Sequence, residues 1–229
     1  MQHILHIESS TEICSVALSV GDNLLLLKES DVSNSHTEKL TILISDCIKE
    51  SGLTMLELDA IAISDGPGSY TSLRIGAATA KAMCYALNIP LISLGSLSIL
   101  AHGVDLSLIN AKDFIVPMID ARRMEVYSCL YDSKLNMLNE NEAIVLTEKT
   151  FEHLMEHNAC LHICGSGAHK YHEAFPNPYI KMHHTQTSAA FMVSLASLAY
   201  REKVFADIAY FSPNYLKDPN ITKSTKKLF

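Results

Sequence analysis

The sequence predicts an α/β protein made of two lobes, each with a mixed central sheet flanked by helices. Short apolar runs typical of strands alternate with segments of helical periodicity along the chain. The series that opens at Ile4 is complete by Leu94, and a similar series starts again near Lys112. We therefore expect a first lobe at residues 1–103 and a second lobe at residues 112–229, which also carries the C-terminal tail.

The first lobe is predicted to open with three strands separated by polar turns: Ile4–Ile7, Cys14–Val20 and Leu24–Leu27. A capping-box pattern, Ser35 followed three residues later by Glu38, begins a helix that extends to Ser51 and ends at Gly52. A strand, a helix and a further strand complete the lobe: Ala60–Ser64, Thr71–Leu87 and Leu91–Leu94.

The second lobe repeats this opening. A shift of 112 residues places Glu8 on Asp120, so that both first strands end in a carboxylate and a polar turn. Actin-like and sugar-kinase-like ATPases have two lobes that each begin in this way, so we expect the actin-like ATPase (RNase H-like) fold. The predicted elements of this lobe are strands at Phe114–Ile119, Glu125–Tyr131 and Leu161–Cys164, helices at Glu148–Glu156 and Ser188–Lys203, and a tail from Phe211.

The composition limits the function classes. A formal net charge of -7 and a pI near 5.8 argue against a nucleic-acid-binding protein that acts alone. No stretch approaches the roughly 20 apolar residues that span a bilayer, and the N-terminus lacks the features of a signal peptide. The six cysteines form no CxxC pair and lie mostly in apolar patterns, as reduced thiols do. We expect a cytoplasmic protein without membrane contact.

A metallopeptidase is one alternative, because His153, Glu156 and His157 form an H-x-x-E-H pattern. On an α-helix this spacing would place both imidazoles on one face, as a zinc site requires. The match is short and no third ligand is apparent, so a solvated helix face is the favoured interpretation. The other histidines of this half, His162, His169, His172, His183 and His184, are expected to be solvent-exposed.

A stand-alone ATPase or phosphotransferase of the sugar-kinase type is the second alternative. Glu8 and Asp120 are expected at strand ends that face a cleft between the lobes. Such enzymes need glycines in the first hairpin so that backbone N–H groups can approach phosphate, and the hairpin at Glu8–Thr11 has none. The Gly165-Ser166-Gly167 turn is weak support for a nucleotide site. We expect no cofactor and no metal site.

The segment from Ser64 to Gly76 is the most informative part of the chain. Pro67 fixes its own φ, and the glycines on either side permit a sharp turn between a strand and a helix. Ser69, Thr71 and Ser72 are candidates to cap that helix by accepting its first N–H groups. The segment is either a well-made turn or a site for an anion or for the backbone of a partner.

The helix Thr71–Leu87 is apolar or small on nearly every side, which predicts burial on every side. Its own sheet would cover one side, and either another part of the same lobe or a partner would cover the other. Small residues such as Gly76, Ala77 and Ala80 would permit close packing of that partner. Ile42, on the preceding helix, lies off its apolar stripe and favours the partner hypothesis.

Three motifs carry a resemblance to the TsaB family, also called YeaZ. Residues 66–76, GPGSYTSLRIG, resemble the family signature GPGSFTGLRIG, with Tyr70 in place of Phe and Ser72 in place of Gly. Residues 4–10 resemble the first strand of the family, and Asp120–Tyr127, DARRMEVY, resembles its second-domain motif. The predicted interface and motif residues are Gly66, Pro67, Gly68, Ser69, Tyr70, Thr71, Leu73, Arg74, Gly76, Ala77, Ala80 and Ile42.

The resemblance implies a bacterial, cytoplasmic protein that is a non-catalytic paralogue of TsaD, the threonylcarbamoyl transferase. TsaD-like proteins carry an H-x-x-x-H metal motif after the strand equivalent to Leu91–Leu94, and here only His102 follows that strand closely. The implied role is a scaffold that pairs with TsaD and supports the ATPase TsaE. Together they modify the adenosine beside the anticodon of tRNA, so tRNA contact is indirect, and a homodimer is expected when the chain is alone.

Overall fold

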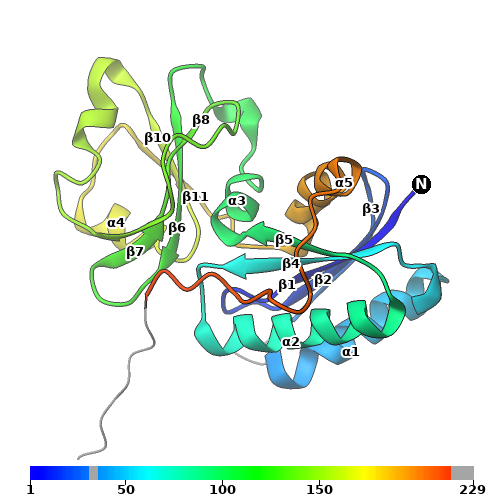
Figure 1. Cartoon of the computed structure of the whole chain (residues 1–229). Coiled ribbons are helices and arrows are strands. Elements are labelled where there is room, and N and C mark those ends of the chain that lie inside the picture. The colour runs from blue at the N-terminus through cyan, green and yellow to red at the C-terminus, as the bar shows by residue number, and fades with distance from the viewer. Residues whose placement is uncertain (31–35, 218–229) are drawn as a thin grey trace, which may run out of the picture.

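A computed structural model describes residues 1–30 and 36–217 of the chain. Two lobes lie side by side, and each is built on its own sheet (Figure 1). The predicted cap residue Ser35 lies outside the described residues. Among the helices in those ranges, none is both long and apolar enough to cross a membrane.

The first sheet has five strands in the order β3-β2-β1-β4-β5. The central strand β1 pairs antiparallel with β2 and parallel with β4, where Ile7 lies opposite Ile63. All the strands predicted for this lobe are confirmed. Their bounds are β1 His3–Glu8, β2 Ser15–Val20, β3 Asn23–Glu29, β4 Ala60–Gly66 and β5 Leu91–Gly95.

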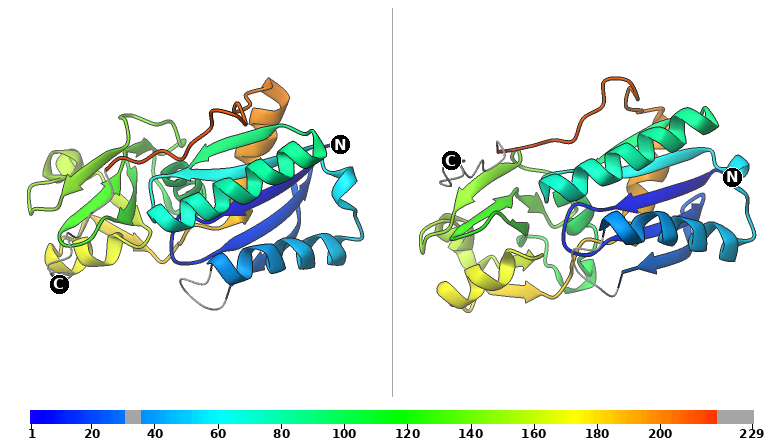
Figure 2. Two further views of the ribbon diagram at one scale, coloured as in Figure 1. Left: turned by 60° about the horizontal axis from the view of Figure 1, so that its bottom comes forward. Right: turned by 90° about the horizontal axis from the view of Figure 1, so that it is seen from below.

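Helices cover both faces of this sheet. Helices α1 (His36–Ser51) and α2 (Tyr70–Leu87) lie together on one face, where Ile7, Ile44 and Ala80 share a buried cluster (Figure 2). The other face is covered by η4 (Ala189–Met192) and α5 (Val193–Glu202), which share a buried cluster with β1 and β4. A short 3-10 helix, η1 (Met55–Glu57), precedes β4.

The chain therefore returns to the first lobe near its C-terminus. The predicted helix Ser188–Lys203 is present as η4 and α5, with Ser188 as its N-cap. Met192 and Ala196 are fully buried and pack with residues of the first sheet, such as Ile4. The range 112–229 expected for the second lobe includes this segment, whereas its apolar contacts lie with the first. Sequence adjacency alone could not show this long return.

The second sheet repeats the topology of the first. Its main path has the order β11-β10-β6-β7-β9, which matches β5-β4-β1-β2-β3 strand for strand. This equivalence confirms the predicted actin-like architecture of two mixed sheets. The bounds are β6 Phe114–Asp120, β7 Glu125–Ser128, β8 Tyr131–Asp132, β9 Glu142–Val145, β10 Leu161–Cys164 and β11 Ile180–His183.

The predicted strand Glu125–Tyr131 is interrupted. It forms β7 and β8, which both pair with β6 in one continuous register, Met118 with Ser128 and Ile115 with Tyr131. In that register the interruption falls opposite Pro117, which has no backbone N–H to donate to the ladder. The split is therefore a local effect of one proline.

The helical segments between residues 96 and 174 differ from the sequence prediction. The helix expected at Glu148–Glu156 is instead the 3-10 helix η3 (Glu152–Asn158), and α4 (Ala168–Ala174) was not predicted. Helix α3 (Ser96–Ala101) was also missed, as was the short 3-10 helix η2 (Leu106–Leu108) that follows it. Helix α3 packs through Leu97 and Leu100 against β6 residues and so joins the two lobes.

Candidate functional site

The Gly-Pro-Gly turn leads from β4 into α2 and lies against the first hairpin. The Ser69 N–H donates to the Ser10 carbonyl oxygen at 2.7 Å. A Cβ on Gly68 would overlap that same carbonyl group, so the hairpin can approach the turn only because this residue is glycine. The turn is thus built to hold the backbone of this chain's own hairpin.

The predicted capping of α2 is only partly right. Ser69 occupies the N-cap position with an extended backbone, but its hydroxyl makes no hydrogen bond to a backbone N–H of the helix. Instead the Ser72 hydroxyl donates to Ser69 Oγ at 2.9 Å. Thr71 lies inside the helix, so the cap prediction for it is wrong, and it is exposed at the mouth of the cleft described below.

Tyr70 is held between a cation and a second ring. The Arg74 guanidinium lies 4.3 Å from the centre of the Tyr70 ring, and the Tyr215 ring centre lies 4.6 Å from it. Cation–π and ring–ring contacts of this kind fix a side chain at a partly exposed site. Tyr215 had no role in the sequence prediction, because nothing local marks it as a neighbour of Tyr70.

Four residues predicted at the partner interface face their own lobe. Leu73, Gly76, Ala77 and Ala80 all lie on the inner face of α2, and Ala80 has no exposed surface. A Cβ on Gly76 would overlap the Ser9 side chain, so its small size serves the packing of the hairpin. These residues cannot touch a partner directly, and the helix period alone did not say which side faces the sheet.

The exposed surface of α1 and α2 is formed by other residues. Tyr85 of α2 is 84% exposed, and Ile42 of the neighbouring helix α1 is 51% exposed. Ala78 and Ala82 lie on the exposed side of α2 at spacings of four and three residues from Arg74 and Tyr85. We call Ile42, Arg74, Ala78, Ala82 and Tyr85 the outer face.

Glu8 does not face the cleft, contrary to the sequence prediction. Its side chain is fully buried, and its Oε1 accepts from the Ser10 N–H at 2.7 Å and from Ser10 Oγ at 2.5 Å. Desolvation raises the pKa of Glu8 to about 7, although the Ser10 hydrogen bonds act against the rise. Its Oε2 has no hydrogen-bond partner among the described residues.

Asp120 lies in a different environment. Its side chain is 49% exposed and pairs with Lys170 Nζ at 2.7 Å. Its Oδ1 also accepts the Arg122 N–H at 2.6 Å, which closes the turn after β6. Of the two carboxylates predicted to be equivalent, the structure therefore places only Asp120 at the cleft.

The cleft between the lobes has a volume of about 880 Å³. Its walls are the first hairpin, the turn into α2, the turn after β6 and the C-terminal segment. Two cations, Arg122 and Lys217, and two carboxylates, Glu12 and Asp120, line it together with the N-terminus of α2. The lining includes Ser10, Thr11, Pro67, Gly68, Ser69, Tyr70, Thr71, Asp120, Arg122, Tyr127, Ser166, Asn214, Tyr215 and Lys217.

The structure does not support a zinc site at the H-x-x-E-H pattern, because the pattern is not on an α-helix. It lies in the 3-10 helix η3, where about three residues complete a turn and positions i and i+4 do not share a face. His153 and Glu156 are exposed, and the side chain of His157 lies outside the description. Within residues 1–30 and 36–217, no group of three or more His, Cys, Asp or Glu is placed to hold a metal ion.

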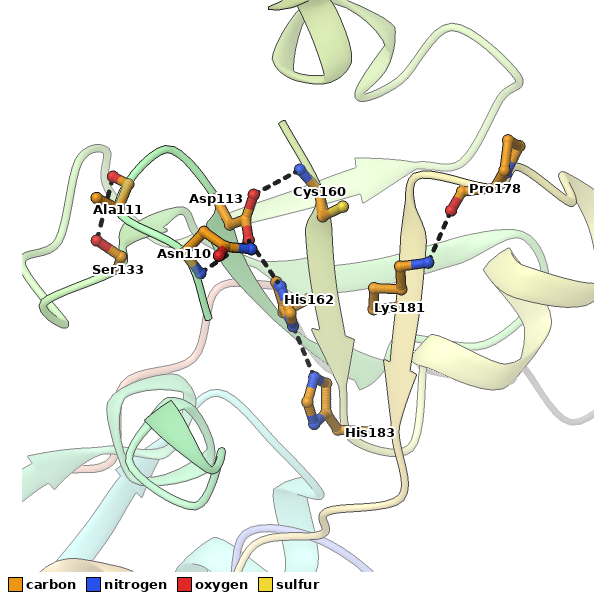
Figure 3. A network of polar contacts seen from close by, with 9 residues as sticks. All are labelled: Asn110, Ala111, Asp113, Ser133, Cys160, His162, Pro178, Lys181 and His183. Atoms are coloured by element: carbon orange, nitrogen blue, oxygen red, sulfur yellow. Dashed lines mark hydrogen bonds and ion pairs between the residues drawn. The ribbon is translucent and has the colours of Figure 1, made fainter. Parts of the chain in front are cut away.

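One histidine expected in solvent is instead buried. His162 is 4% exposed, and its Nδ1 lies 2.8 Å from Nε2 of His183 (Figure 3). Its Nε2 lies 3.3 Å from Asp113 Oδ2. Although desolvation acts to raise it, the pKa of Asp113 is lowered to about 2 because the backbone N–H groups of Cys160 and Asn110 donate to its carboxylate. The chain Asp113–His162–His183 ties β10 and β11 to the start of β6.

Comparison with known proteins agrees with this architecture. Two equivalent sheets and a cleft between them define a two-lobed protein with the actin-like fold. A family model described as "TsaD: tRNA N6-adenosine threonylcarbamoyltransferase" matches residues 30–228. The structure named "YeaZ from Pseudomonas aeruginosa" superposes with a TM-score of 0.78 at 24% identity, covering 94% of this chain and 100% of that one.

Two relatives match along almost their whole length. Each is named "tRNA threonylcarbamoyladenosine biosynthesis protein TsaB". The Haemophilus influenzae protein is 27% identical over 225 residues, 94% of this chain and 93% of that protein. The Bacillus subtilis protein is 26% identical over 221 residues, 93% of each chain. The chain belongs to the TsaB (YeaZ) family, within the wider group that the TsaD model describes.

Proposed function

We propose that this chain is a non-catalytic scaffold in the biosynthesis of threonylcarbamoyladenosine in tRNA. It pairs with a TsaD-like transferase, supports a TsaE-like ATPase, and contacts tRNA only through that complex in the cytoplasm. The names of the full-length relatives and the match to the TsaD model support the process. The burial of Glu8 is the observation that supports a non-catalytic role.

The argument from Glu8 concerns the first hairpin. A hairpin that manages a metal-bound nucleotide needs a charged carboxylate open to the cleft and backbone N–H groups free to meet phosphate. Here the Glu8 carboxyl is buried, and the Ser10 N–H is already bonded to it. The Ser10 carbonyl is in turn bonded to Ser69. These hydrogen bonds hold the hairpin against its own lobe, so the Ser10 N–H is not free to meet a phosphate.

The outer face is the proposed contact with the partner. Tyr85 and Ile42 supply apolar area, while Ala78 and Ala82 let another helix come close. Such a surface fits a second lobe of the same architecture, either that of the TsaD-like transferase or that of a second copy when the transferase is missing. Tyr is enriched at the energetic centres of protein interfaces.

Reconstitution tests the proposal. Purified TsaD-like and TsaE-like proteins from the same organism are assayed for threonylcarbamoyl transfer to tRNA with and without this chain, and ATP hydrolysis is measured for the chain alone. We expect transfer to require the chain, and the chain alone to hydrolyse no ATP. ATP turnover that survives re-purification and is lost in Asp120→Ala would instead support the stand-alone phosphotransferase.

A further inference from the structure

The C-terminal residues 206–217 cross from the first lobe to the second. After α5 this segment runs along the open edge of β5, where the Ala206 N–H donates to the Leu91 carbonyl at 2.8 Å. It then passes the start of α2 and reaches the second lobe, as the orange and red trace shows in Figures 1 and 2. We call residues 206–217 the strap.

The strap is fastened to the first lobe by specific contacts. Lys81 Nζ donates to the Phe211 carbonyl at 2.9 Å, and the Asn214 N–H donates to the Asp65 carbonyl at 2.6 Å. Gly66 has a φ of 119°, and a Cβ there would overlap the Asn214 carbonyl oxygen. The first glycine of the motif is therefore shaped to receive the strap.

Two side chains carry the strap across the cleft. The Tyr215 ring packs on Tyr70 of the first lobe, and Lys217 forms an ion pair with Glu125 of the second lobe. The side chains of Lys217 and Glu125 are 42% and 20% exposed, so solvent and salt weaken their attraction. Asn214, Tyr215, Leu216 and Lys217 all line the cleft and form one of its walls.

The connection between the lobes at α3 has a different character. Helix α3 places Leu97, Leu100 and Ala101 in a buried cluster with Ile115 and Ile119 of the second sheet. Burial of this apolar area holds that joint under all ordinary solution conditions. At the mouth of the cleft the ring contact of Tyr215 holds the strap to the first lobe, and the exposed ion pair of Lys217 with Glu125 joins it to the second lobe. The joint at α3 is permanent, and the contact at the strap is breakable.

We propose that the strap is a latch. Its release lets the second lobe rotate about α3 and opens the interlobe cleft beside the turn at Pro67–Thr71. Because an exposed ion pair forms half of the latch, opening increases with salt concentration. The proposal concerns the isolated chain and does not depend on the identity of its partner.

Distance measurements between the lobes test the latch. In the full chain with Cys160→Ser, spin labels are placed at Ala78→Cys on α2 and Glu173→Cys on α4, both exposed sites. The other five cysteines are buried. Lys217→Glu or Glu125→Lys is expected to raise the open population ~2- to 5-fold. The double variant Lys217→Glu with Glu125→Lys is expected to restore the closed distance. Tyr215→Ala is expected to raise the open population up to ~10-fold.

A matched control and a salt series complete the experiment. Arg201→Glu breaks an exposed ion pair with Asp22 on the first lobe, away from the cleft, and is expected to leave the distance unchanged. High salt is expected to open the wild type and to leave Lys217→Glu unaffected. If every variant shows only the closed distance although the strap amides exchange freely in Lys217→Glu, the latch proposal is overturned. The strap is then released without any opening of the lobes. Lys217 is an exposed site, so this variant is expected to fold.

Discussion

The two lobes share one topology but use equivalent positions differently. Strands β3-β2-β1-β4-β5 of the first sheet correspond to β9-β7-β6-β10-β11 of the second. In each lobe the central strand ends in a carboxylate, Glu8 in the first and Asp120 in the second. Glu8 is fully buried, whereas the side chain of Asp120 is 49% exposed.

The difference follows from what packs on each hairpin. In the first lobe the turn before α2 brings Gly68 against Ser10, and the long helix α2 brings Gly76 against Ser9, so the hairpin is closed into the core. In the second lobe α4 is only seven residues long, and the equivalent turn stays open and pairs with Lys170. A repeated fold thus supplies one rigid hairpin and one open hairpin. The first hairpin packs against α2 and the turn before it, and both hairpins border the cleft.

The largest expected effect is on stability at pH 5, where Glu8 is protonated. Glu8→Ala removes the acceptor of the Ser10 N–H and hydroxyl and leaves a cavity, so we expect a loss of about 2–4 kcal/mol in the free energy of unfolding. Asp120→Ala removes only an exposed ion pair and a turn contact, and should cost at most about 1 kcal/mol. Urea denaturation of both variants measures the contrast. Equal losses of unfolding free energy in the two variants would contradict the view that the Glu8 hairpin is buried and the Asp120 hairpin is open.

The pH dependence of stability should separate the same two positions. Folded Glu8 keeps its proton up to a pKa of about 7, whereas an unfolded glutamate loses it near 4.5. Folding therefore takes up a proton between these values, and the contribution of Glu8 to stability falls as pH rises, by up to about 3 kcal/mol. Glu8→Gln should abolish this trend, and Asp120→Asn should leave it unchanged.

His6 also makes the stability depend on pH, so the contribution of Glu8 has to be measured by comparing the wild type with Glu8→Gln. Burial lowers the pKa of His6 to about 3, so the unfolded chain binds a proton that the folded chain does not between about 3 and 6.5. His6 therefore adds stability as pH rises through that window, opposite in sign to Glu8. The difference between wild type and Glu8→Gln, measured at each pH, isolates the contribution of Glu8. A difference that does not change with pH would show that Glu8 is ionised in the folded state.

The inner and outer faces of α2 provide the next contrast. Gly76→Val would place new atoms against the buried Ser9 side chain, and overpacking of this kind costs about 1–3 kcal/mol. Ala78→Val lies on the exposed side of the same helix and should change stability by no more than about 0.5 kcal/mol. Thermal and urea unfolding of the two variants gives the comparison. If Gly76→Val loses no more stability than Ala78→Val, the hairpin can move away from α2 to accept the larger side chain.

Local patterns predicted much of this architecture. The apolar runs of β1, β4 and β5 and the helical spacing of α1 and α2 were sufficient because each signal lies within one element. The glycines and Pro67 also located the turn correctly. The interface residues were less predictable, because α2 is small or apolar on both sides and Ala78 and Ala80 look alike in sequence.

Contacts between distant segments were beyond the sequence. The pairing of Tyr70 with Tyr215 and of Lys217 with Glu125 depends on the return of the chain to the first lobe. The burial of His162 depends on Asp113, 49 residues earlier in the chain. Residue types and spacing carry no signal for such contacts, and a set of homologous sequences would be needed to reveal them as covarying pairs. The lobe boundaries and the partner surface stay predictions.

Binding to the TsaD-like transferase tests the central claim, that the outer face is a partner surface held by a rigid first lobe. The affinity of Tyr85→Asp for that transferase is compared with the affinity of Leu56→Asp. Leu56 is 87% exposed on η1 and Tyr85 is 84% exposed on α2, so neither substitution should disturb the fold. Tyr85→Asp should weaken binding by about 10- to 100-fold, which corresponds to about 1.4–2.8 kcal/mol, while Leu56→Asp should bind as the wild type does. Wild-type affinity in Tyr85→Asp, with an unchanged melting temperature, would contradict the account.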